Sequence, residues 1–277
     1  MFFEFIVSGA AVGFIVGATG VGGGSLMTPL LTLAFNVPVQ IAVGTDLLFA
    51  AVTKSGGAVA YARRGDIPWT IVLWMALGSV PASLLTTAAL RLWHPDPGQF
   101  GALVRPALGG ALLLTAGAML FRAQIQTLGR RLAASAPLPA GLATAGLAVP
   151  LAGNGAPAAP VPARTLAIGA LLGTLVTLTS VGAGAIGVVA LFFLYPALAA
   201  RKLVGADILH AVPLTLVAGL GHAALGTVDW VMLGGLLLGS LPAIHLGALV
   251  AGRMPEKALR GALSTLLVLI GARLIWI

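Results

Sequence analysis

The chain has 277 residues, of which 59% are hydrophobic and only 8% are charged, whereas soluble domains carry roughly 25% charged residues. So few polar side chains cannot cover a water-soluble globule, and the composition therefore predicts an integral membrane protein. The formal net charge of +8 would suggest a nucleic-acid partner in a soluble protein, but these cations flank apolar segments, where they contact lipid headgroups. We therefore expect no nucleic-acid binding, and the absence of cysteine excludes thiol chemistry.

Apolar segments follow one another along most of the chain. A transmembrane helix needs about 20 apolar residues to cross a core of about 30 Å. Segments of this kind lie at 41–62, 68–91, 102–121, 203–223, 229–251 and 258–276. Residues 3–35 and 165–196 form longer apolar stretches, each with a glycine cluster near its middle. Each long stretch is therefore one kinked helix or two shorter arms that meet at the glycines.

The positions of the loop cations favour the two-arm interpretation. If both long stretches enter the membrane and return, eleven cations lie on one face, and only Arg91 and Arg105 lie on the other. Cytoplasmic loops are enriched in Lys and Arg, so this distribution predicts that the first face is cytoplasmic and that both termini lie outside. The eleven are Arg63, Arg64, Arg122, Arg130, Arg131, Arg164, Arg201, Lys202, Arg253, Lys257 and Arg260.

The sequence also repeats itself. Val21-Gly22-Gly23-Gly24 recurs 160 residues later as Val181-Gly182-Ala183-Gly184, and Gly44-Thr45-Asp46 recurs after 161 residues as Gly205-Ala206-Asp207. Fold-back of the first stretch gives each copy an odd number of crossings, which makes the second copy inverted. We predict an all-α polytopic membrane protein of two inverted repeats. Each repeat has about four transmembrane helices, counting a broken or re-entrant first segment.

Three regions follow from this repeat. Residues 1–122 form the first membrane repeat, residues 123–163 an Ala/Pro-rich cytoplasmic linker, and residues 164–277 the second membrane repeat. The linker contains six prolines in an uncharged stretch, and this composition argues against a helix.

The two glycine clusters are candidate binding sites. A helix that begins inside the membrane directs unpaired backbone N–H groups, and roughly half a positive charge, into the protein interior. An anion would satisfy those donors. The alternative is that the glycines only permit close helix crossing. The residues concerned are Gly22, Gly23, Gly24 and Ser25 in the first copy and Gly182, Ala183, Gly184 and Ala185 in the second.

Four ionisable residues lie within predicted spans: Asp46, Lys54, Asp207 and His210. A charge in the bilayer core costs about 2.5 kcal/mol or more, so each group needs a polar interior or a partner. Asp46 and Asp207 occupy equivalent positions, whereas the position of Lys54 is taken by Thr215 in the second copy. We therefore expect an asymmetric centre with one fixed cation. The alternative is that these groups only pair with one another to lock the helices.

Several motifs in both copies resemble the sulfite exporter TauE/SafE family of membrane transporters. The resemblance covers residues 10–92 and 165–250. Its motifs are residues 17–25 (GATGVGGGS) followed by Pro29, 42–48 (AVGTDLL) with Lys54, 63–69 (RRGDIPW), 204–208 (VGADI) with His210, and 226–230 (GTVDW). It implies a multi-pass permease of the bacterial inner membrane for small sulfur-containing anions such as sulfite or organosulfonates. Several family members carry Gly-Thr-Ser where this chain has Gly44-Thr45-Asp46, and the extra carboxylate points to coupling with a cation.

The sequence therefore predicts a transporter, with export as the expected direction, that moves a small anion by alternating access. The anion would contact the two glycine clusters, Thr45 and Lys54, while Asp46, Asp207 and His210 would carry a coupled proton or ion. We expect no catalytic residue, metal or cofactor. The partners are the anion and membrane lipid, and small-residue faces would allow a homodimer. The alternatives are an intramembrane enzyme acting on a phosphorylated lipid and a passive anion channel.

Overall fold

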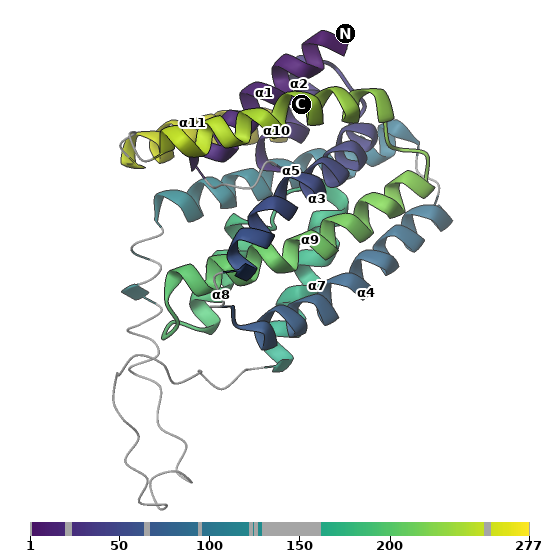
Figure 1. Ribbon diagram of the computed structural model, residues 1–277. Helices are drawn as coiled ribbons and strands as arrows, with labels where there is room; N and C mark the ends of the chain where they lie inside the picture. The colour runs from purple at the N-terminus through teal and green to yellow at the C-terminus, as the bar shows by residue number, and fades with distance from the viewer. Residues whose placement is uncertain are drawn as a thin grey trace, which may run out of the picture.

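The computed structural model describes residues 2–19, 24–63, 67–93, 96–121, 124, 127–128, 162–251 and 256–276. Within these ranges every long element is an α-helix, as predicted, and the helices form one bundle (Figure 1). They are α1 (Phe2–Thr19), α2 (Gly24–Ala34), α3 (Val39–Arg63), α4 (Trp69–Trp93), α5 (Pro97–Leu120), α7 (Pro162–Thr179), α8 (Ala185–Leu194), α9 (Ala200–Ala224), α10 (Trp230–Ala251) and α11 (Glu256–Trp276).

Five helices of the described chain are long and apolar enough to cross a membrane, so the chain is a multi-pass membrane protein. They are the whole of α4 and α7 and most of α5, α9 and α10. The central helix α3 is not among them, because Asp46 and Lys54 interrupt its apolar sequence.

Both long apolar stretches are broken into two helices. In the second copy the Thr165 hydroxyl, at the start of α7, lies 2.5 Å from the Tyr195 hydroxyl, which follows α8. A single helix would separate these residues by about 45 Å, so α7 and α8 fold back as a hairpin. In the first copy the rings of Phe5 and Phe35, at the equivalent positions, lie 5.4 Å apart between centroids. The fold-back interpretation is therefore correct for both stretches.

The first arm of each hairpin packs against the other copy. Along α1, side chains added at Gly9, Gly13 and Gly17 would overlap the backbone of α10 at Leu236, Ser240 and Ile244. Such small-residue stripes allow membrane helices to approach closely.

The equivalent stripe on α7 gives the equivalent contacts with α4. Gly169 meets Met75, and Gly173 meets Ser79. Each copy therefore completes its packing with a helix from the other copy.

At the centre of the bundle α3 lies beside α9 and runs in the opposite direction (Figure 1). Leu48, near the start of α3, contacts Gly219, near the end of α9, whereas Gly57 faces Ile208. This antiparallel arrangement of equivalent helices supports the inverted orientation of the repeats, which stays a prediction, as do the three sequence regions. Most of the predicted linker lies outside the described residues, and α7 begins at Pro162 within it.

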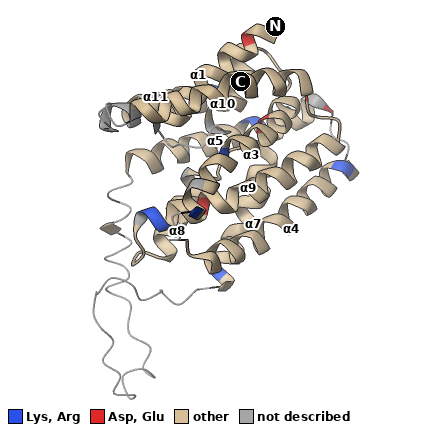
Figure 2. Ribbon diagram, in the orientation of Figure 1, with Lys and Arg blue, Asp and Glu red and all other residues tan. Residues whose placement is uncertain are grey.

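Charged residues are sparse and lie mainly at helix ends, with a few inside the bundle (Figure 2). The face that holds the α3–α4 connection, here the α3–α4 face, has Arg63, Arg201 and Lys202 at helix ends. The opposite α4–α5 face has Arg91. Exposed Trp69 and Trp230 begin α4 and α10, as expected at membrane interfaces.

The first hairpin can be tested by cross-linking in this cysteine-free chain. Phe5→Cys with Phe35→Cys should be joined efficiently by a short bis-maleimide in membranes, because the two rings are in contact. Phe5→Cys with Val59→Cys is the control. The start of α3, Val39, follows Phe35 by four residues, and Val59 lies about 30 Å further along α3. Failure of the first pair to cross-link, with both thiols accessible to a monofunctional maleimide, would contradict the hairpin.

Candidate functional site

The tip of the second hairpin lies between α7 and α8 and is stabilised by backbone turns. Ser180, Gly182 and Gly184 have φ angles of 59°, 128° and 135°. Such positive φ values favour glycine, which explains the glycine cluster at this point. The backbone N–H of Gly187 donates to the Gly182 carbonyl at 3.1 Å, and α8 begins at Ala185. A helix therefore starts inside the bundle, as the sequence predicted.

Lys54 reaches this tip from the other copy. Its ammonium group donates a hydrogen bond to the Ala183 carbonyl oxygen at 2.9 Å. The equivalent residue, Thr215, instead donates to the carbonyl of Ala211 in its own helix at 2.8 Å. The predicted asymmetry is therefore present. One cation lies beside the N-terminal end of α8, and both features attract an anion.

Asp46 is fully buried, and its closest hydrogen bond within the described residues comes from α2. The Thr28 hydroxyl of α2 donates to its Oδ2 atom at 2.6 Å, while Oδ1 has no hydrogen-bond partner among the described residues. Ser180, from the second hairpin tip, lies close to this carboxylate, but its hydroxyl completes no hydrogen bond there. Asp46 therefore lies where α2, α3 and the tip of the other copy meet.

Asp207 occupies the equivalent place in the second copy but differs in its contacts. It is fully buried, and neither carboxylate oxygen has a hydrogen-bond partner in the described part of the chain. Gly187 of α8 packs directly against this carboxylate, so a side chain there would overlap Oδ1. The glycine leaves space for a carboxyl group, and none of the described residues donates a hydrogen bond to it.

His210 lies one turn after Asp207 and is also buried. Its Nε2 atom is 2.8 Å from the Ser79 hydroxyl of α4, whereas Nδ1 has no hydrogen-bond partner within the described ranges. Lys54 is close enough to interact electrostatically with Asp46, Asp207 and His210. We call these four residues the central cluster. Within the described chain no group of three or more His, Asp or Glu side chains is arranged to hold a metal.

The remaining predicted site residues divide into two groups. Gly22 and Gly23 lie outside the described residues, and for Gly24, Ser25 and Ala185 only the helical backbone is described. Thr45 is buried, and its hydroxyl oxygen accepts the backbone N–H of Asp229 at 3.0 Å, just before α10. The structure therefore assigns Thr45 a contact between the two copies.

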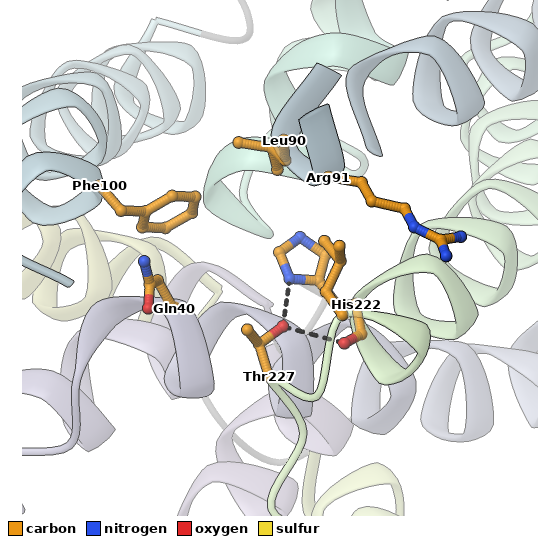
Figure 3. Close-up of a pocket in the computed structure, with 7 residues that line it drawn as sticks. Gln40, Leu90, Arg91, Phe100, His222 and Thr227 are labelled. Carbon is orange, nitrogen blue, oxygen red and sulfur yellow. Dashed lines mark hydrogen bonds between the residues drawn. The ribbon is translucent and has the colours of Figure 1, made fainter. Parts of the chain in front are cut away.

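A cavity of about 290 Å³ at the α4–α5 face was not predicted from the sequence (Figure 3). It lies at the meeting point of the start of α3, the end of α4, the start of α5 and the end of α9. Its lining combines three apolar side chains with a cation, an amide, a hydroxyl and an imidazole: Leu90, Phe100, Leu225, Arg91, Gln40, Thr227 and His222. A sequence pattern could not identify it, because the lining residues come from four helices and a loop.

His222 links this cavity to the second hairpin. Its Nε2 atom lies 2.9 Å from the Thr177 carbonyl oxygen near the end of α7, and Nδ1 lies 2.9 Å from the Thr227 hydroxyl. A carbonyl oxygen only accepts, so Nε2 donates to Thr177. The Thr227 hydroxyl has one hydrogen, which it shares between Nδ1 and the His222 carbonyl oxygen at 3.0 Å. His222 is therefore a hydrogen-bonded packing group that joins α7, α9 and the loop before α10.

Comparisons with known proteins agree with these features. A family model described as sulfite exporter TauE/SafE matches residues 5–274. A probable membrane transporter protein of Bacillus subtilis (strain 168), YjnA, is 32% identical over 272 residues, which are 98% of this chain and 99% of that protein. A second protein of the same organism and description, YdhB, is 27% identical over 80% of this chain and 79% of its own length. No solved structure matches significantly.

The Thr28–Asp46 bond can be tested by stability. Thr28→Val removes the hydroxyl donor of a buried carboxylate and should lower the free energy of unfolding in detergent by about 1–3 kcal/mol. Thr32→Val, one turn further along α2, is the matched control, because its hydroxyl only donates to its own helix. That change should cost about 0.5 kcal/mol or less. If both variants lose the same free energy of unfolding, the contact between Thr28 and Asp46 does not contribute to stability.

Proposed function

Because the chain belongs to the sulfite exporter TauE/SafE family, we propose that this membrane transporter moves a small sulfur-containing anion, such as sulfite or an organosulfonate, across the bacterial inner membrane. Its orientation follows from the positive-inside rule, with the Arg-rich α3–α4 face in the cytoplasm. Export as the direction rests on the family description. The contact between Lys54 and the Ala183 carbonyl carries the proposal, because it brings a cation to a helix that starts within the bundle.

The anion binds between Lys54 and the first turn of α8. The α8 N-terminus provides backbone N–H donors and a partial positive charge, and the Lys54 ammonium provides a full charge. In the conformation described here the ammonium donates to the Ala183 carbonyl, two residues before α8 begins. An anion that takes the place of this carbonyl accepts a stronger hydrogen bond, because the donor and the acceptor then both carry a charge.

The charges of the central cluster favour movement of the anion together with protons. Ionised Asp46 and Asp207 with a charged Lys54 leave one net negative charge, which repels an anion. In a low-dielectric interior this repulsion is strong. Protonation of a carboxyl group removes it and leaves Lys54 available to the substrate. Asp207 is the better carrier of the two, because neither of its oxygens accepts a hydrogen bond among the described residues.

Alternating access follows from the proposed inverted repeats. Each hairpin enters from its own face, and its first arm packs on a helix of the other copy. Tilting of one copy against the other would open the central cluster to each face in turn. We propose that the protein is not an enzyme. The absence of phosphate release from a polyprenyl diphosphate by purified protein is the expected result.

Replacement of the central cation should strongly reduce transport. Lys54→Met should reduce anion flux into proteoliposomes at least about tenfold, which corresponds to loss of about 1.4 kcal/mol of binding energy. Arg105→Gln is the matched control, because this cation is exposed on α5, away from the central cluster. Unchanged flux in Lys54→Met would rule out Lys54 as the counter-charge.

Proton coupling should depend on the carboxylates. The wild-type protein should transport faster at mildly acidic than at mildly alkaline pH, because protonation removes the negative charge that opposes the anion. Asp207→Asn should weaken this dependence more than Asp46→Asn, and the double variant should transport without it. A pH dependence that survives in the double variant would exclude these residues as proton carriers.

A further inference from the structure

Ser180 has a backbone conformation that serine does not favour. It follows α7 at the tip of the second hairpin with a φ angle of 59°, a left-handed value that is uncommon for residues other than glycine. The residue at the equivalent place in the first copy, 160 positions earlier, is Gly20. A serine at such a position adds conformational strain. The strain is explained if the Ser180 hydroxyl group has a role that glycine cannot fill.

The Ser180 hydroxyl group is buried beside a carboxylate without being bonded to it. It lies close to Asp46, yet among the described residues neither Ser180 Oγ nor Asp46 Oδ1 has a hydrogen-bond partner. Ser180 is only 4% exposed and Asp46 is 0% exposed, so water does not replace the missing partners. Oxygen ligands of one cation are arranged in this way, since each directs a lone pair at the ion rather than a hydrogen at its neighbour.

The end of α7 brings further oxygen atoms to the same place. Ser180 directly follows Thr179, the last residue of this 18-residue helix, so the C-terminus of α7 lies beside Asp46. None of the described backbone N–H groups donates to the carbonyl oxygens of Leu178, Thr179 or Ser180. A helix C-terminus carries roughly half a negative charge, which attracts a cation. Carboxylate and carbonyl oxygens suit hard cations, and the C-terminal ends of interrupted membrane helices coordinate Na⁺ in transporters.

The charges around Asp46 fit a monovalent cation. With both carboxylates and Lys54 ionised and His210 neutral, the central cluster has one net negative charge. Lys54 does not contact Asp46, because it lies two helical turns further along α3 and donates to the Ala183 carbonyl. One Na⁺ beside Asp46 brings the net charge of the cluster to zero. A divalent ion would leave an excess positive charge, and Ca²⁺ sites usually contain several carboxylates.

We propose that Asp46 Oδ1, the Ser180 hydroxyl oxygen and carbonyl oxygens at the end of α7 form a Na⁺ site between the two copies. The proposal rests on the transport function proposed above and adds Na⁺ to the proton carried by Asp207. Na⁺ at this place removes the negative charge that opposes an anion at Lys54. Each of the two ions therefore raises the affinity of the protein for the other.

Equilibrium binding of radiolabelled Na⁺ to the purified full-length protein tests the site without transport. The measurement is made at mildly alkaline pH, where the carboxyl groups are ionised, and choline chloride keeps the ionic strength constant. The wild-type protein should bind about one Na⁺ per chain, because the site has a single carboxylate. Unlabelled NaCl should displace the label, whereas choline chloride should not. Sulfite should lower the Kd for Na⁺ severalfold, as the mutual effect of the two ions requires.

Two variants remove ligands of the proposed site. Ser180→Ala keeps the Cβ atom but removes the hydroxyl oxygen, and it should raise the Kd for Na⁺ about tenfold or more. Asp46→Asn removes the charge and should abolish measurable binding. Ser264→Ala is the matched control, because its hydroxyl group is equally buried and has no hydrogen-bond partner in the described chain but lies on α11. Its Kd for Na⁺ should equal that of the wild-type protein.

The outcomes separate the Na⁺ site from the transport function. Folded wild-type protein that binds no Na⁺, or that releases it equally to choline, overturns the site. An unchanged Kd in Ser180→Ala also overturns it, and this variant decides the matter if Asp46→Asn does not fold. If anion flux into proteoliposomes persists in any of these cases, the transport function stands without the Na⁺ site. Specific Na⁺ binding in a protein that moves no anion would leave the site in place and remove the transport function.

Discussion

The bilayer provides no hydrogen-bond partners, so every break in a helix within it must be satisfied by the protein. This requirement organises the centre of the molecule. The break between α7 and α8 leaves backbone groups inside the bundle, and Lys54 of the other copy satisfies the Ala183 carbonyl there. Lys54 in turn needs acidic neighbours, which Asp46 and Asp207 provide from α3 and α9. The central cluster therefore follows from the interrupted helices: the exposed carbonyl requires Lys54, and Lys54 requires the two carboxylates.

The two copies share their backbone contacts and differ in their polar side chains. Phe5 and Phe35 close one hairpin by ring packing, whereas Thr165 and Tyr195 close the other through their hydroxyl groups. Asp46 accepts a bond from Thr28, but its counterpart Asp207 faces Gly187 and has no donor among the described residues. Duplication thus supplied a common scaffold, on which unequal substitutions produced one fixed cation and two different carboxylates.

The repeat and its hairpins could be predicted from the sequence because both depend on local patterns. Glycine clusters, segment length and loop cations are each visible within a few residues, and together they predicted that residues 165–196 fold back. The partners of the buried polar groups could not be predicted in this way. The Ser79–His210 pair joins residues 131 positions apart, and the hydrogen bond from the Asp229 N–H to Thr45 joins residues 184 positions apart. Such contacts depend on how each helix is rotated about its axis and how deep it lies in the membrane. Composition and residue spacing determine neither.

The exchange of arms between the copies has a consequence for biosynthesis. The glycine stripe of α1 is complementary to α10, a helix that begins more than two hundred residues later in the chain. At ordinary translation rates of about 5–20 residues per second, the ribosome needs roughly 10 to 50 s to produce that partner. During this interval the newly inserted first hairpin has lipid on the surface that α10 later covers. The nascent first half therefore waits in the membrane, incompletely packed, until the second half emerges.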